Sequence, residues 1–318
     1  MRKVLTLLTA AGLGAVMMAG PATAEDYPEK SVEMTVLFGG TANSIAQVLT
    51  EQMGGALGQP VVPVSRPGGG GAVGYSYVQG TQPDGYNIVW NSNSINTSHH
   101  TGKIPFDYTA FEPVAKISSE VPALAVRADS GWSSLADLKA AAESMDGTLK
   151  VGISGKGSFT HLTSAALFDA MGIGDKVTYI SYGDGKAPVE LMGARIDAAV
   201  QWPGQYKSYV DAGELNVLAV TGTDRVALLP DVPTAAEQGV DIDITMWRGI
   251  AVPKGTDPAV IDKLEAAAKA AVESEAFMEA SKNLGFNITF AGSEDFGEQI
   301  AKDDEFYAKL LTELGMKQ

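Results

Sequence analysis

Two glycine-rich turns, each leading directly into an expected helix, carry the residues most suited to binding chemistry. The first turn runs from Phe38 to Ser44 and the second from Ser154 to His161, and each follows a run that reads as a strand. The start of a helix exposes unpaired backbone N–H groups and about half a positive charge, so it can hold a carboxylate or a phosphate. Two such helix N-termini that face each other across a cleft would bind a small anion through their dipoles, in place of charged side chains. Such a site needs no nucleophile. The residues expected to line this cleft are Gly39, Gly40, Thr41, Ala42, Asn43, Ser44, Gly157, Ser158, Thr160 and His161.

Polar and aromatic residues at the ends of other expected strands extend this candidate set. A polar loop follows the expected strand 87–90, a glycine turn follows Tyr182, and Trp202 precedes a Pro-Gly pair. We expect Trp202 in one of three places: in the core, between the lobes, or in the wall of the cleft. We adopt the third interpretation. The added candidates for ligand contact are Asn91, Ser92, Asn93, Gly183, Asp184, Gln201 and Trp202.

Ser158 and His161 allow more than one interpretation. Ser158 stands where an N-cap is expected, and capping is compatible with ligand contact. His161 is either a ligand donor or a packed helix residue. Because the two lie three residues apart at a helix start, they share a face, and an exported hydrolase that uses Ser158 and His161 is the alternative function. A Ser–His pair without a placed acid is weak support for it.

Other motifs point away from cofactors and metals. Gly69–Gly74 fits the dinucleotide pattern G-x-G-x-x-G, but Pro67 intrudes and the nearest acidic residue, Asp84, lies in a turn. The Gly155-Lys156 pair lacks the first glycine and the Ser/Thr of a phosphate-binding P-loop. His99 and His100 are adjacent and have no metal-ligand spacing. We therefore expect no catalytic residue, no metal and no cofactor.

The N-terminus and the composition limit the location and the partners. Arg2 and Lys3, an apolar run and Pro21-Ala22-Thr23-Ala24 predict a secretory signal peptide over residues 1–24, cleaved after Ala24, and hence a periplasmic protein. The chain has no cysteine, so its core must hold it together. A net charge of −15 excludes nucleic acid as a partner. Distant surface charge is screened over about 8 Å at physiological salt, so local N–H groups can still capture an anion.

Strand and helix signals alternate along the chain, which is the α/β pattern. Residues 31–38 read as a strand and 43–57 as a helix with Ile45, Leu49 and Met53 on one side. A second helix is expected from Ser158 to about Met171, closed by Gly172. We expect two crossover connections, near Pro122–Ala123 and Trp247–Gly249, about which two lobes would close.

One segment carries a family resemblance. Arg225 to Gly239 contains R-x-x-x-x-P-D-V-P-T-x-x-E-x-G, followed by Trp247 and by Pro253-Lys-Gly-Thr256. This pattern resembles the tripartite tricarboxylate transporter receptors, the TctC or Bug family, and shorter matches extend over nearly the whole mature chain. The resemblance implies a type II-like periplasmic binding protein fold with two α/β lobes, each a mixed sheet flanked by helices, and a ligand cleft between them. The implied bounds are 25–122 plus 250–318 for lobe 1 and 123–249 for lobe 2.

The resemblance also implies a function. The expected protein is a monomeric, non-enzymatic receptor that captures a small mono- or dicarboxylate and delivers it to the membrane permease subunits of a tripartite tricarboxylate-type transporter. A solute sensor for a membrane kinase is the second alternative. The first loop departs from the family pattern, because it is two residues shorter and has Asn43 and Gln47 where an aspartate and an arginine are usual. The acid preferred by other members therefore does not transfer to this chain.

Overall fold

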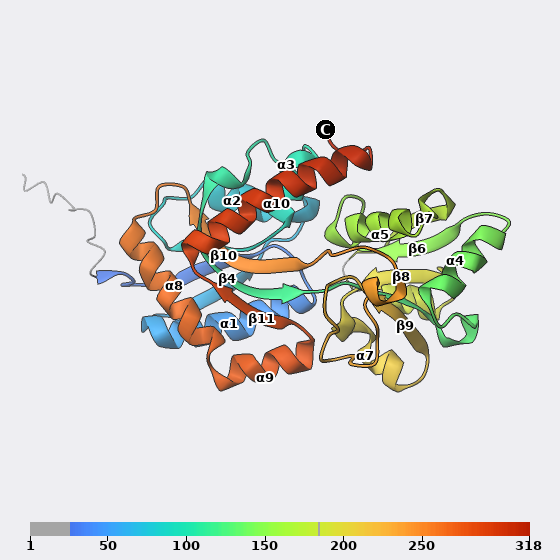
Figure 1. Ribbon diagram of the computed structural model, residues 1–318. Helices are drawn as coiled ribbons and strands as arrows, with labels where there is room; N and C mark the ends of the chain where they lie inside the picture. The colour runs from blue at the N-terminus through green and yellow to red at the C-terminus, as the bar shows by residue number, and fades with distance from the viewer. Residues whose placement is uncertain (1–25, 184) are drawn as a thin grey trace, which may run out of the picture.

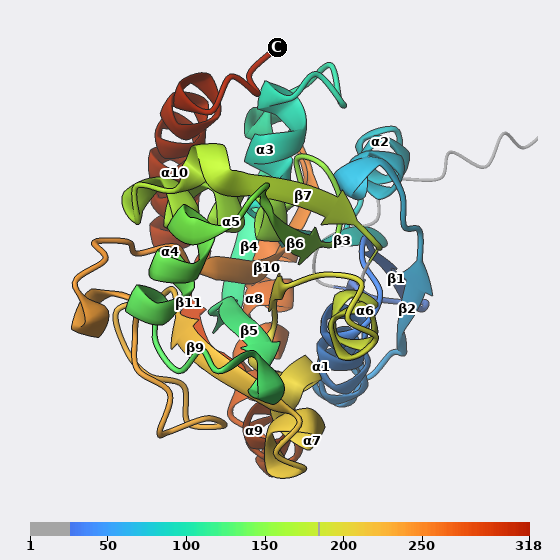
Figure 2. The same cartoon turned by 90° about the vertical axis from the view of Figure 1, so that its right-hand side faces the viewer.

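The computed structural model describes residues 26–183 and 185–318. Its strands form two separate mixed sheets. Figure 1 shows these sheets side by side with helices packed on both, and Figure 2 shows the molecule from the side of the smaller sheet. The expected signal peptide and Asp184 lie outside the described residues. None of the helices in the described ranges is long and apolar enough to cross a membrane.

The larger sheet has six strands in the order β11-β4-β10-β3-β1-β2. Strands β1, β2 and β3 are parallel, whereas β10 runs antiparallel to β3 and to β4. The elements around this sheet are β1 (Val32–Val36), α1 (Thr41–Leu57), β2 (Val61–Ser65), α2 (Ala72–Gln79), β3 (Asn87–Ser92), α3 (Ser94–His100), β4 (Phe111–Glu120), β10 (Met246–Pro253), α8 (Pro258–Val272), α9 (Glu275–Leu284), β11 (Asn287–Ala291) and α10 (Ser293–Glu313).

The smaller sheet has five strands in the order β7-β6-β8-β5-β9. Strand β6 is parallel to β7 and β8, and β5 is antiparallel to β8 and β9. Its elements are β5 (Ala123–Arg127), α4 (Leu135–Ser144), β6 (Leu149–Ile153), α5 (Phe159–Ala170), β7 (Val177–Ser181), α6 (Ala187–Met192), β8 (Ala198–Gln201), α7 (Pro203–Asp211) and β9 (Leu215–Val220). The expected α/β class with two mixed sheets is confirmed.

Local sequence explains the helices that begin at the two glycine turns. Helix α1 buries Ile45, Leu49 and Met53, which are four residues apart and so lie on one face. It ends at Gly58, whose φ of 70° is the left-handed conformation that glycine adopts without strain. Helix α5 ends before Gly172, as expected, and that glycine also has a positive φ of 74°.

The chain passes between the two sheets twice. The first connection joins β4 to β5 at Val121–Pro122, where the sequence placed it. The second ends at Thr245, because β10 and its pairing with β4 begin at Met246, so the expected crossover at Trp247–Gly249 lies inside the strand and was placed too late. The lobe boundaries themselves stay a prediction.

Helix α10 contacts the cores of both sheets. Phe296 and Ile300 belong to a hydrophobic cluster with strands of the larger sheet, whereas Tyr307 and Leu311 pack in the main core of the smaller sheet. Figure 1 shows α10 running from above β10 towards α5. The helix therefore packs against the cores of both sheets on one side of the molecule and connects them.

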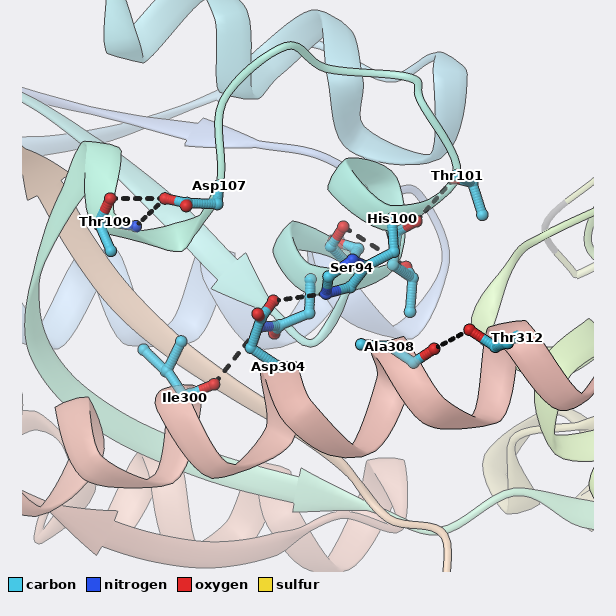
Figure 3. Close-up of polar contacts among 11 residues, drawn as sticks. Ser94, His100, Thr101, Asp107, Thr109, Ile300, Asp304, Ala308 and Thr312 are labelled. Carbon is cyan, nitrogen blue, oxygen red and sulfur yellow. Dashed lines mark hydrogen bonds and ion pairs between the residues drawn. The ribbon is translucent and has the colours of Figure 1, made fainter. Parts of the chain in front are cut away.

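Polar contacts fix α10 to α3. His100 from α3 and Asp304 from α10 point towards each other, with 2.9 Å between Nε2 and Oδ1 (Figure 3). Asn96 also donates to Asp304, over 3.0 Å. The sequence indicated only a polar loop in this region, because a seven-residue helix without a strong apolar stripe has little signal of its own.

Candidate functional site

A cavity lies between residues of the two sheets, where the two glycine turns meet. The cavity is narrow, with a volume of about 50 Å³. Its walls come from the β1–α1 turn, the turn before α2, helix α3, the β6–α5 turn with the start of α5, the start of α7 and the beginning of β10. The lining residues are Phe38, Gly39, Ala42, Gly70, Ser94, Thr97, Ser154, Gly157, Ser158, Phe159, Thr160, Trp202, Gln205, Met246 and Arg248.

Helix α1 presents an N-terminus without a side-chain cap. Gly40 is its N-cap, with φ 59° and ψ −139°, and no side chain hydrogen-bonds to the first turn there. The amides of Asn43 and Ser44 donate back to the Gly40 carbonyl, at 3.1 and 3.2 Å. The remaining first-turn donors lie at Thr41 and Ala42, and Ala42 lines the cavity.

Helix α5 begins with a cap of hydroxyl groups. Ser158 is the N-cap, and its Oγ accepts a hydrogen bond from the His161 amide at 3.3 Å, which confirms the capping interpretation. The same Oγ lies 3.1 Å from Thr160 Oγ1, which in turn accepts from the amide of Ser154 at 3.0 Å. Ser158 and Thr160 therefore hold the end of β6 and the start of α5 together at the cavity wall.

His161 packs beneath the turn instead of facing the cavity. Its Nδ1 accepts a hydrogen bond from the Gly157 amide at 2.9 Å, and its ring meets Tyr179 edge to face with centroids 4.7 Å apart. Burial, and then the positive charges of Lys156 and Lys103, lower the pKa of His161 from 6.5 to about 4. At neutral pH His161 is an uncharged residue that positions the Gly157 turn, so of the two readings the structure favours the packed one.

This arrangement predicts an acid sensitivity that depends on His161. The pKa is 6.5 when His161 is unfolded and about 4 when it is folded, so the unfolded chain binds more protons between these values and stability falls as the pH drops through this window. A His161→Gln variant, whose side-chain oxygen can still accept from the Gly157 amide, should lose less of its Tm between pH 7 and pH 5 than the wild type. An unchanged decrease in His161→Gln would contradict the assignment.

The structure brings together only part of the sequence-derived set. Six of the candidates line the cavity, namely Gly39, Ala42, Gly157, Ser158, Thr160 and Trp202. The others in the described ranges do not line it, namely Gly40, Thr41, Asn43, Ser44, Asn91, Ser92, Asn93, His161, Gly183 and Gln201. Asp184 lies outside the described residues. A ligand-contact role for any of them stays a prediction.

Several of the outlying candidates have structural partners. Asn93 accepts from the Trp247 amide at 2.8 Å and donates to Asp303 and the Tyr307 hydroxyl, both at 3.1 Å, so it ties β10 to α10. Asn91 accepts from the Tyr75 hydroxyl at 2.7 Å. These side chains were singled out for their polarity, but buried polar groups also hold elements together.

Sequence reasoning missed Arg248. It is 2% exposed, and it is the only charged residue in the lining as far as the chain is described. Its Nε donates to the buried carboxylate of Glu120. A charged side chain that the sequence analysis did not expect therefore lines this cavity, while the expectation that dipoles hold the anion stays a prediction. The missed signal was one arginine within the otherwise apolar run 246–252, because a charge in a buried strand needs a partner or a function.

The described part of the chain gives no support for a metal centre. No group of three or more His, Cys, Asp or Glu side chains that could hold a metal ion occurs within residues 26–183 and 185–318. The lining offers hydroxyls, one amide side chain, backbone groups and one guanidinium. Such a set suits an oxygen-rich anion.

Comparisons with known proteins agree with this picture. BugT of Bordetella pertussis is 30% identical over 308 residues, which cover 94% of this chain and 94% of BugT. The structure of the periplasmic binding protein BugD is 29% identical, with a TM-score of 0.82 over 92% of this chain and 99% of BugD. The two-lobed periplasmic binding protein fold expected from the sequence is thus confirmed.

Two proteins from Rhodopseudomonas palustris share the fold at lower identity. One, solved with adipate, is 24% identical with a TM-score of 0.83 and covers 91% of this chain and 99% of its own. The other, MatC with bound malate, is 22% identical with a TM-score of 0.80 and covers 90% of this chain and 100% of its own.

The family match decides between receptor and enzyme. The model described as "Tripartite tricarboxylate transporter family receptor" matches residues 45–316. The family consists of binding receptors, so the alternative of a hydrolase that uses Ser158 and His161 is wrong. By this match over most of its length, the chain belongs to the TctC family of tripartite tricarboxylate transporter receptors.

Proposed function

We propose that this protein is a periplasmic receptor that encloses a small mono- or dicarboxylate between its two sheets and delivers it to the membrane permease of a tripartite tricarboxylate-type transporter. The carboxylate binds at the start of α5, where Ser158 and Thr160 provide hydroxyls and the first turn of the helix provides N–H groups. The β1–α1 turn, with Gly39 and Ala42, covers it from the opposite side.

The observation that carries this proposal is the composition of the cavity. Its lining has hydroxyl groups, an uncapped helix start and one cation, and among its described members it has no carboxylate. A hydrogen bond to a charged group contributes about 1.5–3 kcal/mol, so a few of them, less the cost of ordering, suffice for micromolar binding at about −8 kcal/mol. The relatives solved with adipate and malate are consistent with ligands of this class.

A ligand screen tests the proposal. The mature chain is incubated with C3–C6 mono- and dicarboxylates, including malate and adipate, and with uncharged and cationic analogues of the same length. We expect one or more acids to raise the Tm, because a ligand that binds only the folded chain stabilises it by mass action. Isothermal titration calorimetry of the acids that raise the Tm then gives the affinity. A shift with uncharged or cationic solutes alone would overturn the proposal.

A further inference from the structure

Arg248 occupies an unusual place, since it is a fully buried charge at the wall of the ligand cavity. It is the third residue of β10, which lies between β3 and β4 and begins where the chain returns from the smaller sheet. Its partner Glu120 is the last residue of β4, where the chain leaves for the smaller sheet, and it too is only 2% exposed. The ion pair therefore lies beside both connections between the sheets.

The guanidinium keeps donor capacity that the protein does not use. Glu120 accepts from Nε, whereas Nη1 is buried and has no hydrogen-bond partner among the described residues. A buried donor without an acceptor is unfavourable, and native proteins rarely leave one without a reason. Because Arg248 lines the cavity, an oxygen atom of the ligand can supply the missing acceptor.

Aromatic rings connect Arg248 to the opposite wall. Its Cζ lies 5.9 Å from the centroid of the Trp202 ring, and Trp202 stacks on Phe159 at 6.0 Å and an interplanar angle of 19°. Phe159 is the first residue of α5, next to the Ser158 cap. The cavity thus has donors at two separate places, the start of α5 and Arg248, with an aromatic surface between them.

We propose that Arg248 is a specificity-determining residue that binds a second carboxylate of the ligand, so that the site selects dicarboxylates over monocarboxylates of the same length. This inference rests on the proposed function, in which the first carboxylate binds at the start of α5. The planar guanidinium fork matches a carboxylate, and it stays charged at any physiological pH. Glu120 fixes the plane of the fork by holding Nε, which leaves Nη1 for the ligand.

The test compares matched pairs of acids, succinate with butyrate and adipate with hexanoate, by isothermal titration calorimetry. The wild type should bind the dicarboxylate of at least one pair about tenfold or more tightly than its monocarboxylate. In the double variant Arg248→Gln/Glu120→Gln neither partner is left as an unpaired buried charge. Its preference should fall to roughly threefold or less, through weaker binding of the dicarboxylate.

Two further variants keep the test decisive. Arg248→Lys retains a charge beside Glu120 but loses the fork, so its preference for the dicarboxylate should fall at least about twofold, which is less than in the double variant. This variant keeps the inference falsifiable even if the double variant does not fold. Arg66→Gln/Glu33→Gln removes a half-buried ion pair in which Nη1 of Arg66 lies 2.8 Å from Oε1 of Glu33. Neither residue is among those that line the cavity in the described part of the chain. This control should keep the wild-type preference.

The outcomes separate the inference from the proposed function. If the wild type binds monocarboxylates as tightly as dicarboxylates, or if both Arg248 variants keep its preference, the inference is overturned while the carboxylate receptor stands. If none of a full C3–C6 acid series binds the wild type, the proposed function fails and the role of Arg248 fails with it.

Discussion

A Ser158→Asp variant is expected to lose carboxylate binding almost completely while it stays folded. Aspartate is as good an N-cap as serine, so helix α5 keeps its first turn. Its carboxylate, however, would project from the position of a lining residue towards the bound anion. Two like charges about 4 Å apart repel by about 4 kcal/mol at an effective dielectric constant of 20, which is roughly a thousandfold in affinity. Calorimetric titration with an acid that raises the wild-type Tm measures this loss.

Ser158→Asn is the matched control for that variant. Asparagine also caps helices well and has a similar size to aspartate, but it adds no charge. Its affinity should stay within about tenfold of the wild type, because only one hydroxyl contact changes. If Ser158→Asp binds the acid as tightly as Ser158→Asn does, the anion does not bind at the start of α5.

A Gly249→Ala variant should show the largest loss of stability among the single-methyl changes considered. A Cβ at Gly249 would lie 2.4 Å from Cζ of Phe296 and 2.6 Å from the carbonyl oxygen of Ala115. The backbone of β4 cannot move away without breaking its pairing with β10, so the clash must be relieved by distortion. Overpacking of this kind costs about 1–3 kcal/mol, which lowers the Tm of a protein of this size by several degrees. Thermal unfolding followed by circular dichroism measures the shift.

Gly55→Ala is the control for the added methyl group. Gly55 is exposed in α1, and a Cβ there would have no heavy atom within 4 Å. Alanine is favoured over glycine inside a helix by about 0.5–1 kcal/mol, so the Tm should rise slightly. Equal effects of the two substitutions would mean that close packing around Gly249 does not restrict this position.

The elements that border the site were predictable because their signals are local. The apolar spacing of Ile45, Leu49 and Met53 gave α1, and Gly58 gave its end. The N-cap role of Ser158 followed from its place before an apolar helix. Strands β4 and β11 and helices α3, α7 and α9 were not anticipated, since their residues show little periodicity and these elements depend on the sheet or helix against which they pack.

The candidate site was predictable only in part. The glycines and hydroxyl residues at the two turns could be found from the sequence, because a turn is determined by a few consecutive residues. His161 and Asn93 looked equally suitable for a ligand, but His161 bonds to the Gly157 amide and Asn93 to α10 and β10. Whether a polar side chain serves a ligand or another element depends on what packs against it.

The sequence alone determined the α/β class, the receptor family and the two glycine turns that open α1 and α5, because these depend on patterns within short stretches of chain. Only the tertiary structure decided that α10 joins both cores and that a cation lies in the cavity wall. Arg248 and Glu120 are 128 residues apart in the chain and meet because β10 pairs with β4. A buried charge is stable only with its partner in place, and no local pattern specifies a partner at that distance.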